Sequence, residues 1–434
     1  MAGADRLENR QYDVIVVGAG FTGLAAASQL REAGLDVVLI EARDTVGGRV
    51  SSERFEDGVR VDTGGQFVCR DMPEVLALAK THDRRILMAY DGGNPTYQPS
   101  IPLEKGYEIW QGVDALRERM IATDPADASL HRLTVSDWVA RQEDVPDDVR
   151  RSFLRLVKGL WCRSPDDVAF FYLASNDRRI TNTHSEMEAF LEDTMHALAE
   201  DMARALGDRL HLSTPVKALT YTDDAVTIDT ADKKLSARRV ILAVPPIMAG
   251  RLTYDPPLPE TLAEAFSAWG AGSVIKLNIR YDAPFWRKKD QSGSVMWSDP
   301  QGLYACDASR PDYSGLVMFV GGPLALEWHA RPAEDLQAFV AERLVAALGP
   351  QAASIREFSI RDWTDDPWSD GAYSDVIVRP GAIDAEDVLR KGLGPVRFAS
   401  SELSLSYPGY VEGAIWAGKS AARTVAVELG VSAE

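Results

Sequence analysis

The chain has 434 residues, of which 45% are hydrophobic and 26% are charged, and its formal net charge is -18. This composition indicates a globular protein with a sizeable core and two or three domains, and it excludes a disordered or fibrous chain. The acidic balance repels nucleic acid and anionic membranes and favours cationic small molecules, although solubility alone explains it equally well.

Targeting segments, disulfides and metal sites are not expected. No segment approaches a run of about 18 apolar residues, and residues 1–11 are polar where a signal peptide needs an apolar run. Cys69, Cys162 and Cys306 lack Cys-x-x-Cys spacing, so we predict reduced core residues. The histidines show no metal or triad spacing. We expect a cytoplasmic protein that binds no nucleic acid, membrane or metal. Whether it forms a homodimer stays open.

The N-terminal region predicts a strand, a glycine-rich turn, a helix and a second strand within about 30 residues. The apolar residues 12–17 indicate the first strand, residues 18–33 the turn and helix, and residues 36–40 the second strand. A further helix is predicted from Pro73. Residues 12–40 thus predict a complete βαβ unit of the kind that binds dinucleotides.

The middle of the chain changes from mainly helical to mainly strand-like patterns. Residues 92–183 predict mostly short helices, as in an inserted second domain. Residues 185–207 predict one helix, with Ser185 and Glu188 at capping-box spacing. An antiparallel meander is then expected from strands at 216–222, 225–230 and 239–244.

The C-terminal half predicts a second mixed block. Its expected elements are strands at 273–281, 316–320 and 355–363, a helix at 332–348, and a strand, loop and helix within 396–429. No repeat or low-complexity linker separates the blocks, so we predict two interleaved domains.

Gly18, Gly20 and Gly23 have Gly-x-Gly-x-x-Gly spacing after the first strand. Gly18 permits a tight turn, Gly20 lets the backbone approach a pyrophosphate, and Gly23 allows close helix packing. The following helix offers free N–H groups to phosphates. Glu41, 18 residues after Gly23, can accept both ribose hydroxyls and would repel a 2'-phosphate, which argues against NADP. A buried turn with an incidental acid is the alternative, and NAD and FAD both remain open.

The residues after the second strand favour FAD. The run Glu41-Ala42-Arg43-Asp44-Thr45-Val46-Gly47-Gly48-Arg49 adds glycines for close backbone contact and arginines suited to bidentate phosphate contacts. This run resembles that of the FAD-dependent amine oxidase family, the monoamine-oxidase-like flavoenzymes.

The resemblance continues in family order along nearly the whole chain. Residues 62–67 are similar to the segment under the isoalloxazine ring, residues 214–216 to the valine backbone against adenine, and residues 243–246 also match. Residues 399–402 and 407–414 resemble the C-terminal flavin motif, with Ser400 where relatives commonly have glycine. The FAD-binding residues that this implies are Gly18, Gly20, Thr22, Gly23, Glu41, Ala42, Arg43, Gly48, Arg49, Gly64, Gly65, Gln66, Phe67, Val216, Glu402 and Val411. In the family, the residue matching Glu402 reaches the ribityl chain.

Three residues match the family's reacting end. Lys276 corresponds to the lysine that holds a water near flavin N5, although a cation at a strand edge is the alternative. Tyr373 and Tyr410 correspond to two aromatic rings that face each other and hold the amine, whereas ordinary core packing is the alternative. Ala372 occupies the position where some relatives tether flavin through cysteine, so the resemblance implies non-covalent FAD.

The resemblance implies an α/β (α+β) fold with two interleaved domains. A Rossmann-like FAD-binding domain would comprise residues 1–80, 189–270 and 378–434, and a substrate domain of mixed sheet and helices would comprise 81–188 and 271–377. The implied reaction is hydride transfer from an amine to FAD N5, which yields an imine, followed by reoxidation by O2 to H2O2.

The substrate is narrowed only by residues 404–414, which look most like bacterial 6-hydroxynicotine oxidases and suggest a cyclic secondary or tertiary amine. Trp161 and Tyr304 are candidates to line the substrate pocket, but as lone aromatics they fit the core better. The alternatives are an oxidase of primary amines or polyamines, a flavin dehydrogenase that uses a carrier protein, and a flavin-bound interaction protein without turnover. No extra coiled-coil arm or basic patch supports the last.

Overall fold

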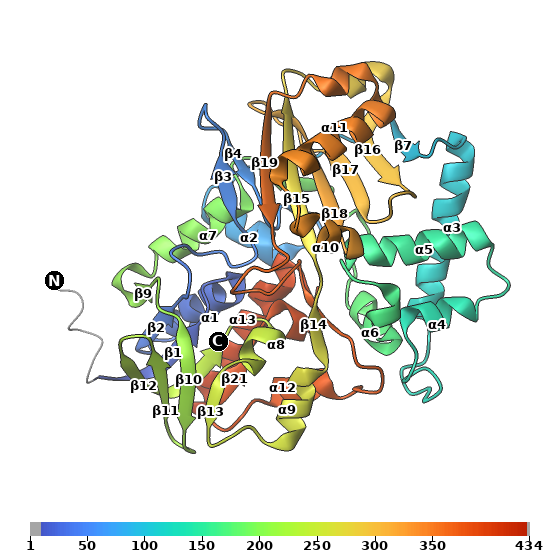
Figure 1. Ribbon diagram of the computed structural model, residues 1–434. Helices are drawn as coiled ribbons and strands as arrows, with labels where there is room; N and C mark the ends of the chain where they lie inside the picture. Colours follow the sequence, from blue (N-terminus) through green and yellow to red (C-terminus); the bar gives the residue numbers. More distant parts are fainter. Residues whose placement is uncertain (1–9, 432–434) are drawn as a thin grey trace.

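The first strand lies inside an eight-stranded sheet, in a computed structural model that describes residues 10–431 (Figure 1). Strand β1 (Gln11–Val17) pairs in parallel with β2 (Val37–Ile40) and with β12 (Lys234–Leu242). Val14 and Val16 pack into one core, whereas Ile15 and Val17 pack into another. The sheet is therefore covered on both faces, which explains why this strand is a continuous apolar run.

The predicted meander is confirmed, but it is joined to the parallel strands rather than separate. The sheet order is β13-β10-β11-β12-β1-β2-β9, and β21 also pairs with β12. Its remaining strands are β10 (Val216–Tyr221), β11 (Val226–Thr230), β13 (Thr253–Asp255), β9 (Leu210–His211) and β21 (Val396–Phe398). Strand β12 begins earlier than predicted because Lys234 already pairs with Asp229 of β11.

The helix of the βαβ unit belongs to a group of four helices that share one core. They are α1 (Phe21–Glu32), α2 (Pro73–Thr81), α7 (Met195–Arg204) and the C-terminal α13 (Val411–Glu428). Helix α13 packs along α1 and contacts α2, and α7 also contacts α1. Residues from both ends of the chain thus build one core, as the interleaved prediction requires. Residues 1–9, most of the polar N-terminal stretch, lie outside the described residues.

The single helix predicted over 185–207 is wrong. Residues Ala189–Leu191 form β8, which pairs with β5 (Phe67–Val68) and β6 (Ile86–Met88), and the helix starts only at Met195. The cap is Thr194, whose side chain accepts a hydrogen bond from the Ala197 amide. The helical spacing of apolar residues here coincides with a buried strand, and tertiary pairing decides between the two.

A second, six-stranded sheet has the order β19-β15-β18-β17-β16-β7. Its strands are β7 (Asn94–Gln98), β15 (Val274–Tyr281), β16 (Gln291–Trp297), β17 (Leu303–Asp307), β18 (Ser314–Gly321) and β19 (Glu357–Asp362). Helix α11 (Ala333–Leu348) packs on this sheet, as predicted, and α10 (Pro323–His329) contacts it as well. Strand β7 was not anticipated within the helical region.

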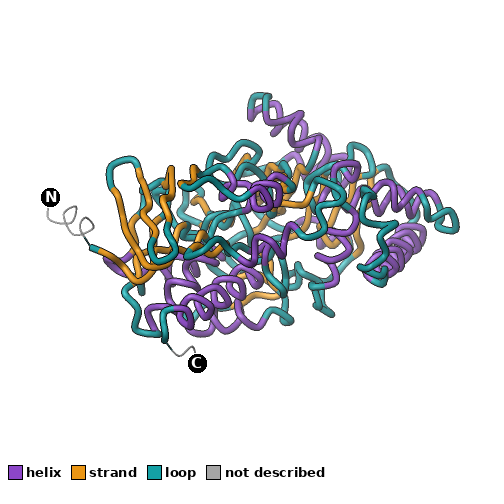
Figure 2. Tube along the Cα trace, turned by 90° about the horizontal axis from the view of Figure 1, so that it is seen from below, coloured by secondary structure: helices purple, strands orange, loops and turns teal. Residues whose placement is uncertain are grey.

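The helical region between residues 103 and 178 lies beside the second sheet (Figure 1). Its helices are α3 (Leu103–Ile121), α4 (Val135–Ala140), α5 (Asp147–Leu160) and α6 (Phe170–Arg178). Helices α3 and α5, with 19 and 14 residues, are longer than the short helices predicted. Figure 2, seen from below, shows helices concentrated at one end of the molecule and a group of strands at the other.

Short elements complete the fold. They are β3 (Ser52–Arg54), β4 (Arg60–Asp62), α8 (Pro246–Gly250), α9 (Glu260–Ser267), β14 (Trp269–Ala271), β20 (Asp375–Ile377) and α12 (Ala385–Lys391). The antiparallel pair β14 and β20 carries the chain between the two sheets. The three cysteines are buried and free, as predicted. Within residues 10–431, no helix is long and apolar enough to cross a membrane.

Candidate active site

The glycine-rich turn has the geometry that its sequence predicts. Gly18 has a φ of 99°, and a Cβ there would lie 2.6 Å from the carbonyl oxygen of Ala243. A Cβ on Gly23 would lie 1.8 Å from the carbonyl oxygen of Gly18, so only glycine allows α1 to pack this closely. Helix α1 therefore starts with its N-terminus at the mouth of the turn.

An open space lies in front of this helix N-terminus. A Cβ on Gly20 would meet nothing closer than the Gly47 carbonyl oxygen at 3.9 Å, and Gly48 lies opposite. Backbone amides, a helix N-terminus and absent side chains together fit the phosphates of a dinucleotide. The residues present therefore fit a flavin nucleotide at this position.

Glu41 is buried at the end of β2, next to the turn. Its carboxylate accepts hydrogen bonds from the amide of Ala19 at 2.6 Å and from the amide of Arg43 at 2.9 Å. Burial raises the pKa of Glu41, and these amide contacts oppose the rise. The backbone thus holds the carboxylate at the cavity wall, where a ribose can reach it.

Arg43 is engaged by the protein itself. Its guanidinium forms a bidentate ion pair with Asp366, and one of the two contacts is 3.0 Å long. Asp366 also accepts hydrogen bonds from Arg361 and from the Ser369 hydroxyl. Arg43 therefore ties the cofactor-side turn to the loop after β19, and the expected phosphate contact is not its main interaction.

Arg49 and Glu402 form a buried ion pair, with Nη1 and Oε1 2.5 Å apart. Glu402 also accepts hydrogen bonds from the Asp375 amide at 3.0 Å and from the Ser401 hydroxyl at 3.1 Å. Burial would raise the pKa of Glu402, but Arg49 holds it below its usual range. The direct ribityl contact assigned to Glu402 needs correction, because Arg49 lines the cavity whereas Glu402 lies behind it.

Asp375 is a buried acid beside Glu402 that the sequence prediction did not single out. The residue is 1% exposed and accepts a hydrogen bond from the Ile247 amide at 3.0 Å. Burial and then the neighbouring Glu402 raise its pKa. An acid within the apolar run of β20, just after Tyr373, was the only available signal.

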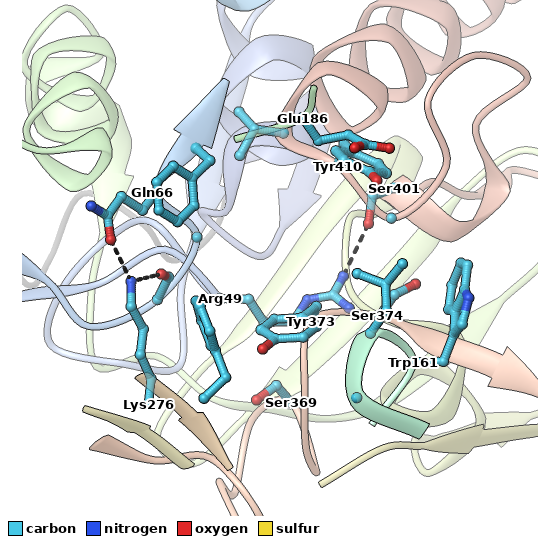
Figure 3. Close-up of a pocket in the computed structure, with 18 of the residues that line it drawn as sticks. Arg49, Gln66, Trp161, Glu186, Lys276, Ser369, Tyr373, Ser374, Ser401 and Tyr410 are labelled. Atoms are coloured by element: carbon cyan, nitrogen blue, oxygen red, sulfur yellow. Dashed lines mark hydrogen bonds between the residues drawn. The ribbon is translucent and has the colours of Figure 1, made fainter. Parts of the chain in front are cut away.

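Lys276 lies in the centre of the second sheet rather than at a strand edge. Strand β15 is flanked by β18 and β19, and Lys276 is 2% exposed. Its Nζ donates to the Gly64 carbonyl at 2.7 Å and to Gln66 Oε1 at 2.9 Å (Figure 3). Burial lowers the pKa of Lys276 to about 8, although the nearby Asp62 carboxylate opposes the shift. The strand-edge interpretation is thus excluded.

Tyr373 and Tyr410 line the same cavity (Figure 3). Tyr373 packs edge-on against Phe319, with ring centroids 6.0 Å apart, and Tyr410 packs edge-on against Tyr407 at 6.1 Å. Phe319 also lies 5.8 Å from the ammonium group of Lys276. Aromatic faces and a lysine thus meet at one end of the cavity, and the face-to-face pairing of the two tyrosines stays a prediction.

The cavity has a volume of about 770 Å³ and connects the glycine-rich turn with Lys276 and the two tyrosines. Every residue predicted to bind FAD or to act in catalysis lines it, except Gly23 and Glu402. Trp161 and Tyr304 also line it, and both pack against a hydrophobic core on their other side. Among residues 10–431, no group of three His, Cys, Asp or Glu residues could hold a metal ion.

Comparison with known proteins agrees with this geometry. The family of flavin containing amine oxidoreductases matches residues 21–94 and 111–426. The chain belongs to this family.

Relatives in this family extend over the whole chain. The flavin-containing amine oxidase B of Cavia porcellus is 28% identical over 97% of this chain and 87% of its own length. Cyclohexylamine oxidase from Brevibacterium oxydans superimposes with a TM-score of 0.89 at 27% identity, covering 97% of this chain and 100% of that chain. The structure of putrescine oxidase bound to putrescine superimposes with a TM-score of 0.88 at 27% identity, covering 97% of this chain and 99% of that chain. The protein is thus a flavin-containing amine oxidoreductase.

Proposed function

We propose that this amine oxidoreductase binds FAD without a covalent bond and oxidises an amine C–N bond to an imine. The observation that carries this proposal is the single cavity, because it joins a dinucleotide cradle to a buried lysine and two tyrosines. The chemistry that the flavin would supply is acceptance of a hydride from the amine α-carbon, followed by reduction of O2 to H2O2.

The cofactor end would hold FAD largely through the backbone. Gly18, Gly20 and Gly48 would contact the pyrophosphate, and Glu41 would accept the ribose hydroxyls. Arg49 would face the flavin portion, with Glu402 holding the guanidinium in place. The other proposed contacts are Thr22, Ala42, Arg43, Gly64, Gly65, Gln66, Phe67, Val216 and Val411. Gly23 would act by packing α1 against the turn.

The absence of a tether follows from the residue before Tyr373. Ala372 has no nucleophilic atom, and the three cysteines are not cavity-lining residues. Denaturation should therefore release all of the flavin as FAD. Yellow colour that remains with the precipitated protein would contradict this part of the proposal.

The reacting end would orient the amine and exclude bulk water. Tyr373 and Tyr410 would hold the neutral amine through their ring faces. Lys276 has three N–H donors and uses two of them on Gly64 and Gln66, so one remains for a water in the cavity. Lys276 would thereby hold a water molecule beside the reacting nitrogen.

The proposed substrate is a cyclic secondary or tertiary amine of the 6-hydroxynicotine type, as residues 404–414 suggest. A second candidate is a primary amine or polyamine, and the carboxylate of Glu186 at the substrate end favours it. A dehydrogenase that uses a carrier protein and a flavin-bound protein without turnover are distinguished by experiment.

The deciding experiment mixes the purified yellow protein anaerobically with a panel of amines that includes nicotine-type alkaloids and diamines. Bleaching of the flavin followed by H2O2 release in air supports an oxidase. Bleaching without peroxide formation supports a dehydrogenase. A flavin that stays oxidised with every amine contradicts the proposed function.

A further inference from the structure

Glu186 is a carboxylate at the substrate end of the cavity that the proposed reaction does not use. It lies in the turn before β8 and lines the cavity near Tyr410 (Figure 3). Burial raises the pKa of the Tyr410 phenol, and the next largest contribution is the charge of Glu186. The carboxylate is thus close enough to this ring to act on anything bound against it.

The surrounding charges leave the carboxylate of Glu186 largely uncompensated. Arg117 of α3 donates from Nε to the buried Asp177 at 2.7 Å, whereas its Nη1 is 4.0 Å from Glu186. A distance of 4.0 Å is at the outer limit of an ion pair. Arg117 is therefore paired mainly with Asp177, and Glu186 has only the longer contact with the guanidinium.

A carboxylate beside aromatic and apolar side chains attracts a cation, because these neighbours do not replace its hydration. Ile180, Met187 and Tyr410 line the cavity with Glu186 and contribute such surface. The side chain of Glu186 is 29% exposed, so a ligand can reach it. The expected ligand group is an ammonium or another protonated nitrogen.

The nitrogen that binds Glu186 cannot be the nitrogen that is oxidised. Oxidation of the C–N bond requires a neutral amine with a free lone pair, whereas an ion pair with a carboxylate stabilises the protonated form. We infer that Glu186 is a specificity-determining residue that binds a second, protonated nitrogen of the substrate. The enzyme then prefers dibasic amines over monobasic amines of the same shape. This inference rests on the proposed function.

The test compares matched pairs of amines in anaerobic stopped-flow reduction of the bound flavin. Putrescine is paired with butylamine and piperazine with piperidine, so that open-chain and cyclic substrates are both covered. The wild type should reduce faster with the dibasic member, by about ten- to hundredfold at low concentration, as a charge-assisted hydrogen bond allows. The difference should lie in the Kd and not in the limiting rate.

Glu186→Gln should remove this preference, and the monobasic amines should change by no more than about twofold. Glu186→Asp, which keeps the negative charge, should keep part of the preference for dibasic amines. The control is Glu188→Gln in the same segment, because Glu188 pairs with Arg70 and does not line the cavity. All variants should retain their flavin.

Equal reduction by both members of each pair, unchanged in Glu186→Gln, would overturn the inference and leave the proposed function standing. Failure of every amine to reduce wild-type flavin would overturn the proposed function instead. The Kd values from the flavin absorption change on binding would then still test Glu186, because loss of the dibasic preference in Glu186→Gln supports the inference and equal Kd values contradict it.

Discussion

The cofactor end and the substrate end of the cavity are built in different ways. At the cofactor end, Gly18, Gly20 and Glu41 come from one βαβ unit, and they present backbone and one carboxylate that the backbone holds. At the substrate end, Lys276 of β15 meets Tyr373 from the loop before β20. A short motif thus specifies a backbone cradle, whereas a side-chain site depends on the packing of distant segments.

The largest effect is expected at the cofactor end, from Gly20→Val. The new side chain would occupy the open space in front of Gly48, because a Cβ there meets nothing closer than 3.9 Å. We expect a folded but colourless protein, as measured by circular dichroism and flavin absorbance. Gly159→Ala at the substrate end, where a Cβ meets nothing within 4 Å, is the control and should stay yellow. A yellow Gly20→Val protein would show that the phosphates bind elsewhere.

Glu402→Gln tests the buried ion pair with Arg49 at the cofactor end. Breaking a buried pair leaves Arg49 without its main partner, which costs about 3 to 5 kcal/mol. Urea unfolding should show a loss of this size. Asp144→Asn, which removes the exposed partner of Arg119, should cost no more than about 1 kcal/mol. Equal losses in both variants would mean that Glu402 does not stabilise Arg49.

Lys276→Met should leave flavin binding intact and slow flavin reduction or reoxidation about tenfold or more. The pKa of Lys276 is lowered from 10.5 to about 8, so a rate that depends on its proton should change around pH 8. Stopped-flow rates between pH 6 and pH 10 should show this ionisation in the wild type and lose it in Lys276→Met. Unchanged rates for both steps would remove Lys276 from the mechanism.

The same pKa has a consequence for stability. The folded state binds the Lys276 proton more weakly than the unfolded state does, because burial lowers the pKa from 10.5 to about 8. This contribution to the free energy of unfolding therefore rises from about pH 8 to about pH 10.5. Urea unfolding of wild type and Lys276→Met should show that the difference in their free energies of unfolding changes across this range in the direction of greater wild-type stability.

The smallest effects are expected at the tyrosines. Tyr410→Phe keeps the ring face and should change amine affinity by no more than about twofold, whereas Tyr410→Leu should weaken it about two- to tenfold. The corresponding changes at Tyr373 should behave alike if both rings hold the amine. Steady-state KM values for one amine measure the difference. A loss in Tyr410→Phe as large as that in Tyr410→Leu would assign the role to the hydroxyl and not to the ring face.

The sequence predicted most of the fold because its strongest patterns are local. The βαβ unit, the meander, β15 and α11 all follow from periodicity and glycine positions. The prediction of one helix over residues 185–207 failed because the apolar spacing there fits a helix. Only pairing with β5 and β6 shows that Ala189–Leu191 is a strand. A strand of three residues has no pattern of its own.

The residues of the candidate site also differ in whether the sequence alone could place them. The glycine cradle and Glu41 could be placed from the chain alone, because their neighbours in sequence are also their neighbours in space. Glu186 carries no local signal in the sequence, and its importance follows only from the cavity and from the charges around it.

The sequence by itself determined the family and the cofactor turn, and its resemblance to the family singled out Lys276, Tyr373 and Tyr410 as candidate residues. Only the tertiary structure decided that Lys276 lies in a central strand, that Glu402 holds Arg49 from behind, and that Trp161 lines the cavity. The physical reason is that burial, ion pairing and shared cavities arise between segments far apart in the chain, and no periodicity records which distant side chain will be the partner.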